Sequence, residues 1–463
     1  MKLTALLTAL LIAGCSTAPV IDPASFPATP AAFKEGDGKW TLARPAEAEP
    51  RGAWWKSFGD AVLDDLIERA DRKNTSIQVA AARLAQARAL VRSANADRLP
   101  QLGVGASATR GDGLPNTLAG NAQTLVTAGA NLSYEADLFG RLAQTSHAAE
   151  LDRQSAAGLL QSARLLVQAD VAQTYLSMRA LDTERALVRR TLETYRGTLA
   201  LTERRFRAGD VAELDVSRAK TEVAATESEA LALDRRRAEL EHALAVLVGE
   251  VASTFQVAEA DWSTALPVIP AGVPSTVLTR RPDVSAAQSA MLAAQSRVGV
   301  AKAAWFPDVS LTASAGQASS DLSDLFKWSA RAWGVGALLS LPIFDGGRRE
   351  AGIESAHAQM DASVARYREQ VLVAFRDVED QLSALRLLAD QAEAQGRAVS
   401  SASRTTALSD ARYRNGLVSQ LELLDAQRSE LRNRRQALAV QSAQYQATVG
   451  LVRALGGGWG ERT

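Results

Sequence analysis

The chain contains few of the residues on which enzymes, metal sites and disulfide-rich folds depend. Its 463 residues include three histidines, four methionines and one cysteine, so an intramolecular disulfide framework is excluded. Aromatic residues make up only 5% of the chain, which suits closely packed helices better than a core rich in β-strands. We therefore expect no enzyme activity, no metal site and no cofactor apart from a covalent modification of the cysteine.

An excess of charge of either sign is also absent. The 52 Lys and Arg residues balance the 52 Asp and Glu residues, so the formal net charge is zero. Long-range attraction to a polyanion requires an excess of basic residues, and nucleic acid is therefore not an expected partner. His147, His242 and His357 are isolated within helical patterns, without the neighbouring residues that a catalytic or metal site needs.

The amino terminus has the pattern of a lipoprotein signal. A basic start precedes an apolar run at residues 3–13, and small residues then lead to Cys15. The run is much shorter than the roughly 20 residues that a membrane-spanning helix needs. We predict a signal peptide at residues 1–14 and a covalent lipid on Cys15. Residues 15–55 are rich in proline and alanine and predict a tether.

The rest of the chain is a duplication with a constant spacing. The same 207 residues separate Pro100 from Pro307, Gly140 from Gly347, and Gly209 from Gly416. A unit of this length is too long for a short solenoid repeat and predicts two similar halves. The predicted parts after the tether are a first repeat at 56–260, an equatorial connection at 261–281 and a second repeat at 282–463.

Each repeat contains a pattern typical of a two-stranded β-hairpin. Apolar residues alternate with small or polar residues over 101–135 and over 308–342, which predicts strands with one apolar face. Four strands are too few to close a barrel, since small barrels take about eight. An open sheet in lipid would leave its edge hydrogen bonds unsatisfied. Association of three chains would close a barrel of twelve strands.

Each hairpin of strands is followed by a long helical pattern. In the first repeat this pattern runs without interruption over 141–207, which corresponds to a helix of about 100 Å. Apolar residues recur with heptad spacing and predict coiled-coil packing. Gly209 and Gly416 interrupt the patterns of the two repeats, so each repeat is expected to end in an antiparallel helical hairpin with its tip near that glycine.

Six segments together resemble the TolC-type outer-membrane efflux family, specifically the lipid-anchored branch that works with resistance-nodulation-division pumps. They are WWKSFGDAVLDDLI (54–67), YEADLFGR (134–141), RRPDVSAAQ (280–288), WFPDVSLTASAG (305–316), LPIFDGGRR (341–349) and RYRNGLVSQLELLDAQRS (412–429). The resemblance implies a mainly α homotrimer with a twelve-stranded barrel in the bacterial outer membrane, four strands from each chain. A long α-helical coiled-coil tunnel would continue the barrel into the periplasm.

The resemblance also implies a function and its partners. The trimer would conduct drugs or other toxic solutes passively to the exterior. A periplasmic adaptor, also called a membrane fusion protein, and an inner-membrane resistance-nodulation-division pump would deliver them. Outer-membrane lipid would surround the barrel. The exposed turns at Gly209 and Gly416 are the expected adaptor-docking tips, because a helical hairpin end favours helix-on-helix contact.

A gate at the periplasmic end is implied in the same way. The family's hydrophobic constriction falls on Leu421, and its acidic rings fall on Glu422 and Asp425. Three carboxylates around a narrow lumen repel one another and filter by charge. Candidates for holding the gate closed are Asp215 and Arg218 of the first hairpin, which are expected to bond to Tyr413 or Glu422 of the second.

Two other functions remain open from the sequence. A duct for protein secretion would have the same fold, and a lipid-anchored coiled-coil spacer would have no pore. The strands with small residues on one face argue against the spacer, and ion conductance would separate the two. The lipoprotein signal and the segment 280–288 favour the efflux branch over the secretion duct by analogy.

Overall fold

A computed structural model describes residues 52–111, 122–260, 262–267 and 280–457, with residues 19, 21, 26–27, 30 and 32–35 of the amino-terminal region. The predicted signal peptide and Cys15 lie outside the described residues, as does most of the predicted equatorial connection. Within the described ranges, no helix combines the length and the hydropathy that crossing a membrane requires.

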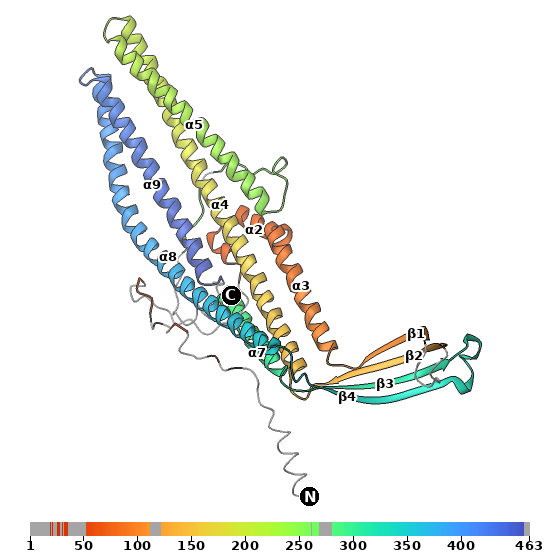
Figure 1. Ribbon diagram of the computed structural model, residues 1–463. Coiled ribbons are helices and arrows are strands. Elements are labelled where there is room, and N and C mark those ends of the chain that lie inside the picture. The colour runs from red at the N-terminus through yellow and green to blue at the C-terminus, as the bar shows by residue number, and fades with distance from the viewer. Residues whose placement is uncertain are drawn as a thin grey trace. The chain divides into compact units, whose positions relative to one another are not determined.

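Long helices make up most of the structure, and four strands form one sheet (Figure 1). The first repeat contains η2 (Trp54–Phe58), α2 (Ala61–Lys73), α3 (Thr75–Ala96), β1 (Gln101–Gly111), β2 (Gln123–Ala136), α4 (Arg141–Arg207) and α5 (Glu213–Leu247). The second contains α7 (Pro282–Ala303), β3 (Asp308–Ser319), η3 (Leu322–Asp324), η4 (Trp328–Ala330), β4 (Arg331–Ser340), α8 (Arg348–Arg414) and α9 (Gln420–Ala454). The prediction of a mainly α fold is confirmed.

The duplication is visible in the bounds of the helices. The pairs α3 and α7, α4 and α8, and α5 and α9 each begin and end 207 residues apart. Helices α4 and α8 both have 67 residues, and α5 and α9 both have 35 residues. No insertion or deletion separates these elements of the two repeats. The predicted internal repeat is therefore confirmed.

The two helical hairpins turn at the glycines that the sequence indicates. Gly209 has φ 83° and Gly416 has φ 72°, a conformation that favours glycine because it has no Cβ. The N–H of Gly209 donates to the carbonyl of Phe206 at 3.0 Å, and the next N–H donates to the carbonyl of Arg205 at 2.9 Å. These two bonds form a Schellman motif, and the equivalent bonds close α8 at Gly416.

The sheet has the order β1-β2-β3-β4, and all neighbouring strands are antiparallel. Its central pair, β2 and β3, joins the hairpins of the two repeats. Gly129 lies opposite Gly316 in that pair. A Cβ added to Gly129 would lie 2.7 Å from the carbonyl oxygen of Ala315, so the backbones are too close for a side chain there. These glycines therefore allow the two hairpins to join in one sheet.

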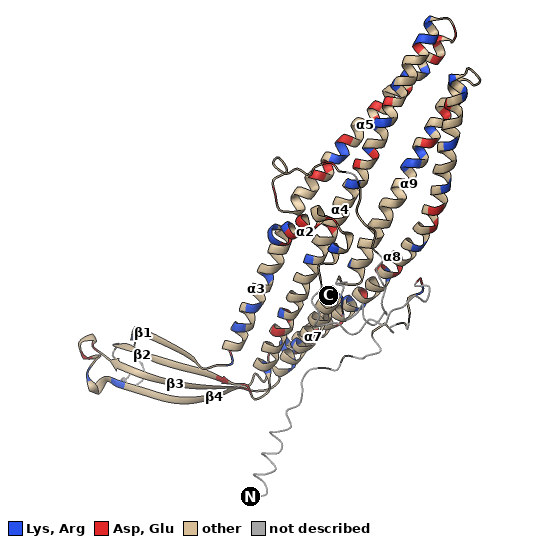
Figure 2. Ribbon diagram, turned by 180° about the vertical axis from the view of Figure 1, so that it is seen from behind, with Lys and Arg blue, Asp and Glu red and all other residues tan. Residues whose placement is uncertain are grey.

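The sheet has the two different faces that the alternation predicts. One cross-strand row consists of Val104, Ala130, Ala315 and Trp333, and the next consists of Gly103, Asn131, Ser314 and Gly334. Val104 is 87% exposed and Trp333 is 79% exposed in the single chain. Charged residues are frequent along α4, α5, α8 and α9, whereas the strands consist largely of other residues (Figure 2).

Packing divides the chain into two compact units, and each takes segments from both repeats. The first consists of residues 1–27, 82–157 and 286–369, and it contains the sheet. The second consists of residues 28–81, 158–285 and 370–463, and it contains the tips of both helical hairpins. Compact packing therefore crosses the boundaries between the repeats. The boundaries that we drew from the sequence stay a prediction.

Part of the predicted tether packs on a helix. The backbone N–H groups of Lys34 and Glu35 donate to the carboxylate of Glu379 on α8, at 2.7 and 3.0 Å. The carboxylate of Glu35 accepts from the guanidinium of Arg386 on the same helix at 2.6 Å. This bond lowers the pKa of Glu35. Lys34 and Glu35 are therefore bound to α8 by specific contacts.

Candidate functional site

The tip of the second helical hairpin leads directly into α9. Ser419 is the N-cap of α9, and its hydroxyl accepts a hydrogen bond from the N–H of Glu422 at 3.4 Å. Glu422 lies in the first turn of the helix, where a negative charge interacts favourably with the helix dipole. One of the predicted gate residues therefore also contributes to the start of the helix.

The three predicted gate residues lie on the exposed side of α9. Leu421 is 42% exposed although it is a large apolar residue, whereas Leu423 and Leu424 are almost fully buried. Leu421 and Asp425 are four residues apart and so lie one above the other on the helix. Both, with Glu422, are accessible in the single chain. The structure therefore brings an apolar and two acidic side chains together at this tip.

Asp425 is linked to the first hairpin by an arginine that the sequence analysis did not single out. The guanidinium of Arg428 lies 3.4 Å from the Asp425 carboxylate. The Nε of Arg428 also donates to the carboxylate of Glu222 on α5 at 2.9 Å. The bond to Glu222 raises the pKa of Arg428. The i, i+3 spacing of Asp425 and Arg428 on a predicted helix could have indicated this ion pair from the sequence.

The predicted latch residues Asp215 and Arg218 contact each other. Their charged groups are 3.8 Å apart, one turn apart on α5. Arg218 is 42% exposed and Asp215 is 27% exposed. In the described part of a single chain, the structure pairs them within α5 instead of bringing them to Tyr413 or Glu422. Their role in holding a gate closed stays a prediction.

Tyr413 contacts the first hairpin through two other residues. Its hydroxyl lies 3.4 Å from the hydroxyl of Thr202, and both residues are buried. The guanidinium of Arg205 lies over its ring, 4.8 Å from the centroid, and is within 3.5 Å of the Tyr413 carbonyl oxygen. Cation–π contact of this kind stabilises partly desolvated arginine. Tyr413 therefore joins the two hairpins near their tips, through Thr202 and Arg205 and not through Asp215 or Arg218.

Further ionic contacts between the hairpins recur with heptad spacing. Arg435 lies seven residues after Arg428 on α9, and Glu229 lies seven residues after Glu222 on α5. The Arg435 guanidinium contacts Glu229 and also lies 2.7 Å from Glu184 of α4. These pairs line a cavity of about 1110 Å³ together with Tyr195, Thr226 and Leu431, among others. Burial raises the pKa of Tyr195 to about 12.

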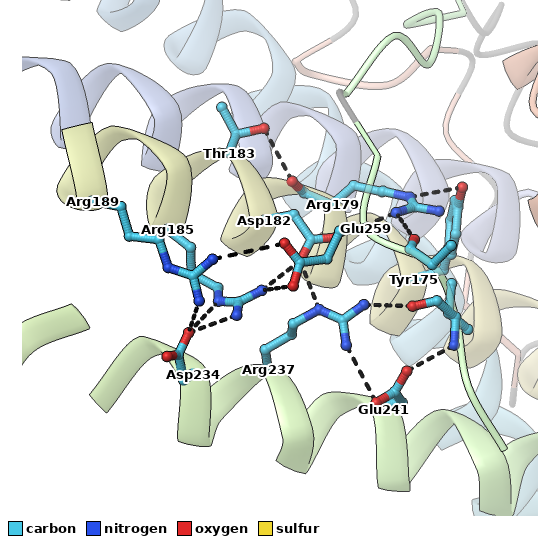
Figure 3. Close-up of polar contacts among 12 residues, drawn as sticks. Tyr175, Arg179, Asp182, Thr183, Arg185, Arg189, Asp234, Arg237, Glu241 and Glu259 are labelled. Carbon is cyan, nitrogen blue, oxygen red and sulfur yellow. Dashed lines mark hydrogen bonds and ion pairs between the residues drawn. The ribbon is translucent and has the colours of Figure 1, made fainter. Parts of the chain in front are cut away.

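A buried cluster of charges holds the first helical hairpin together, and the sequence analysis missed it. Figure 3 shows three guanidinium groups around the carboxylate of Asp182, whose side chain is only 4% exposed. The distances to it are 3.2 Å from Arg179, 3.4 Å from Arg185 and 2.8 Å from Arg237. Since Arg237 belongs to α5 and the other three residues to α4, the cluster connects the two helices.

The same arginines bind the segment that follows α5. Arg179 donates to the carbonyl of Ala258 at 2.7 Å, and Arg237 donates to the carbonyl of Val257 at 2.6 Å. Glu259 accepts from Arg185 at 2.8 Å, and this bond lowers the pKa of Glu259. The cluster therefore fixes a chain segment without regular structure. In the part of the chain that the structure describes, no group of three or more His, Cys, Asp or Glu residues could hold a metal ion.

A protein-family model matches the chain twice. The model of the outer membrane efflux protein family matches residues 66–250 and again residues 273–457. The chain belongs to the outer membrane efflux protein family. This membership agrees with the resemblance seen in the sequence. It makes the chain an efflux channel of the outer membrane, a transporter and not an enzyme.

Relatives within this efflux family match over nearly their whole length. The cation efflux system protein CusC of Escherichia coli is 32% identical over 462 residues, which are 99% of each chain. The solvent efflux pump outer membrane protein SrpC of Pseudomonas putida is 34% identical over 461 residues, 97% of each chain. The solved structure of the outer-membrane channel OprN has a TM-score of 0.88 and 30% identity, covering 96% of this chain and 100% of that one.

The segments that resemble the efflux family have structural roles in the chain. Arg281, from segment 280–288, binds Asp283 at 2.7 Å and Asp377 of α8 at 3.1 Å, and it also donates to the carbonyl of Ala454 at 3.3 Å. These contacts attach the start of α7 to the second helical hairpin. In segment 134–141, the charged groups of Glu135 and Arg141 are 2.6 Å apart where β2 gives way to α4.

Proposed function

We propose that three copies of the chain associate through the edges of their sheets to form a twelve-stranded barrel in the outer membrane. The observation that carries this proposal is the four-stranded sheet itself. Strands β1 and β4 lie at its two edges, and one face presents an exposed apolar row. In lipid, edge N–H and C=O groups require partners, and pairing β4 with β1 of the next copy supplies them.

The helical hairpins then form a tunnel in the periplasm, and its tip carries the gate. Threefold symmetry turns Leu421, Glu422 and Asp425 into one apolar and two acidic rings. The exposure of all three side chains in the single chain supports this assignment. Arg428 neutralises Asp425 only in part, because it also binds Glu222. The acidic ring therefore keeps a charge that filters what passes.

Passive conduction is the activity that we assign to this tunnel. An inner-membrane resistance-nodulation-division pump supplies the energy, and a periplasmic adaptor docks at the tips near Gly209 and Gly416. The relatives are named for cation efflux and for solvent efflux, so their names do not agree on one cargo. We assign drugs or other small toxic solutes as the class transported.

A covalent lipid on Cys15 anchors the amino terminus to the membrane. The specific contacts of Lys34 and Glu35 with α8 support this arrangement, because they fix the chain within about 20 residues of the cysteine. Mass spectrometry of the intact mature protein tests the proposal. The lipid mass must disappear in Cys15→Ser, and a wild-type protein without added mass would contradict the anchor.

Conductance in a planar bilayer tests the channel and the gate together. We expect trimers of the wild-type protein to conduct weakly and Asp425→Ala to conduct more, because removing the acidic ring and the bond to Arg428 loosens the constriction. The control is Asp410→Ala, which removes a half-buried carboxylate of α8 near the same tip, paired with Arg414 at 2.9 Å. Equal conductance in both variants would remove Asp425 from the gate. No conductance in any trimer would favour the spacer.

A further inference from the structure

The connection between β3 and β4 exposes an unusual group of apolar side chains. This segment, residues 320–330, is called here the outer loop and contains the short helices η3 and η4. Leu322 is 70% exposed, Phe326 is 82% exposed and Trp328 is 77% exposed. Leu325 is 4% exposed, so the loop has a buried residue that fixes it. The exposed side chains are therefore presented by an ordered turn.

Arg331 determines the side of the sheet on which Trp328 lies. Its guanidinium lies over the Trp328 ring, 3.1 Å from the centroid, and its Nε donates to the Trp328 carbonyl at 2.8 Å. Arg331 is two residues before Trp333 on β4, and alternation places both on the same face. That face is the exposed apolar one. Trp328 therefore continues the apolar surface beyond the end of the strand.

The charges of the outer loop are balanced when Arg331, the first residue of β4, is counted with it. The ammonium of Lys327 lies 2.7 Å from the Asp324 carboxylate, and this contact lowers the pKa of Asp324. With Asp321 in the loop and Arg331 at the start of β4, the segment 320–331 carries two acidic and two basic residues. Because opposite charges are equal in number over this segment and Lys327 pairs with Asp324, it has no strong field of one sign. Its surface is suited to an interface between apolar and polar surroundings.

We propose that the outer loop lies in the interfacial layer of the outer leaflet and that Phe326 and Trp328 contact lipid there. This inference rests on the proposed barrel, in which the apolar face of the sheet meets the acyl chains. The loop lies at the end of the strands away from α7 and α8, and so at the exterior side of the barrel. Aromatic rings favour the membrane interface, where one edge is apolar and the other is hydrated.

Tryptophan fluorescence in vesicles tests this contact. The full-length trimer is reconstituted in phosphatidylcholine vesicles whose acyl chains carry bromine near the headgroup, and in vesicles without bromine. Bromine quenches only tryptophans that touch the acyl chains. We expect Trp328→Phe to lose a share of the quenchable emission similar to that lost in Trp333→Phe. Trp333, on the apolar face of β4, is the matched control.

The results separate two claims, the lipid contact of the outer loop and the position of the sheet in the membrane. Loss of quenchable emission in both variants supports the proposal. Loss in Trp333→Phe alone, with Trp328 quenched by acrylamide from the water phase, overturns the lipid contact but leaves the barrel intact. Loss in neither variant contradicts both the loop and the membrane position of the sheet. Circular dichroism and the migration of the unheated trimer establish that each variant is folded and assembled.

Discussion

The two helical hairpins have identical lengths and identical turns, yet their interiors differ. In the first hairpin, Val188 packs with Leu181, Ala230 and Leu233 in one buried apolar cluster. In the second, Gln395 takes the place of Val188 and donates to the side chain and carbonyl of Asn433 on α9. At this position the same backbone is therefore held by apolar burial in one repeat and by polar contacts in the other.

The charged cluster of the first hairpin has no counterpart in the second. Ala389 takes the place of Asp182, Ala392 that of Arg185, and Gln444 that of Arg237. Other contacts between α8 and α9 are also polar, such as the bond from Ser403 to Glu430 at 2.9 Å and that from Thr406 to the Ala426 carbonyl at 3.1 Å. Exchanging such bonds for water costs little net free energy. We therefore expect the helices of the second hairpin, which carries the candidate gate, to separate more readily than those of the first.

The largest effect is expected from breaking the cluster that only the first hairpin has. Asp182→Ala leaves three buried arginines without their common partner, and we expect a loss of about 3–5 kcal/mol in the free energy of unfolding. Denaturant unfolding, with hydrogen exchange in α4 and α5, measures the effect. Asp390→Ala, at an exposed position next to Ala389, should change stability by less than about 0.5 kcal/mol. Similar values for both variants would mean that the cluster does not stabilise the hairpin.

An intermediate effect is expected from giving the second hairpin the interior of the first. The double substitution Gln395→Val and Asn433→Thr introduces the residues found at the equivalent positions, Val188 and Thr226. We expect amide hydrogen exchange in α8 and α9 to slow by about five- to tenfold, because apolar burial replaces polar contacts. The reverse change, Val188→Gln with Thr226→Asn, should accelerate exchange in α4 and α5. If amide exchange is unchanged in both double variants, the difference between the two interiors does not cause the second hairpin to open more readily.

The smallest difference is expected where the two hairpins are alike. Gly209→Ala and Gly416→Ala each place a Cβ on a residue with positive φ, and neither Cβ meets an atom within 4 Å. Only the backbone conformation resists the change, at a cost of about 1 kcal/mol for each variant. Thermal unfolding should show equal shifts. A shift at one tip only would show that its turn has contacts beyond those of the single chain.

Features that depend on local pattern or on the repeat could be predicted from the sequence. The constant spacing of 207 residues predicted the equal helices, and the glycines at 209 and 416 predicted the turns. The alternation of the strands predicted both faces of the sheet. The strands themselves extend from Gln123 to Ala136 and from Arg331 to Ser340, close to the predicted hairpins. These features depend on the pattern of neighbouring residues or on the internal repeat, and both can be read directly from the sequence.

Contacts between distant segments were not predictable in the same way. Asp182 and Arg237 are 55 residues apart, and each lies in a helix rich in charged residues. In such a helix the sequence does not distinguish a buried charged side chain from one exposed to solvent. The link from Arg428 to Glu222 spans 206 residues. The partner of Tyr413 was expected among acidic or basic residues of α5, but Thr202 and Arg205 of α4 face it. Only the packing of the helices decides which of many similar side chains meet.

The pairing of β2 with β3 has a consequence for the order in which the protein forms. The two strands belong to different repeats. β2 therefore cannot pair with β3 until the chain has been synthesised and exported as far as residue 319. Pairing over such a separation is slow compared with pairing between neighbouring helices. The helices of the first repeat can therefore assemble while the sheet is still incomplete. A chain whose translation stops early contains the first strands but cannot complete a surface suited to lipid.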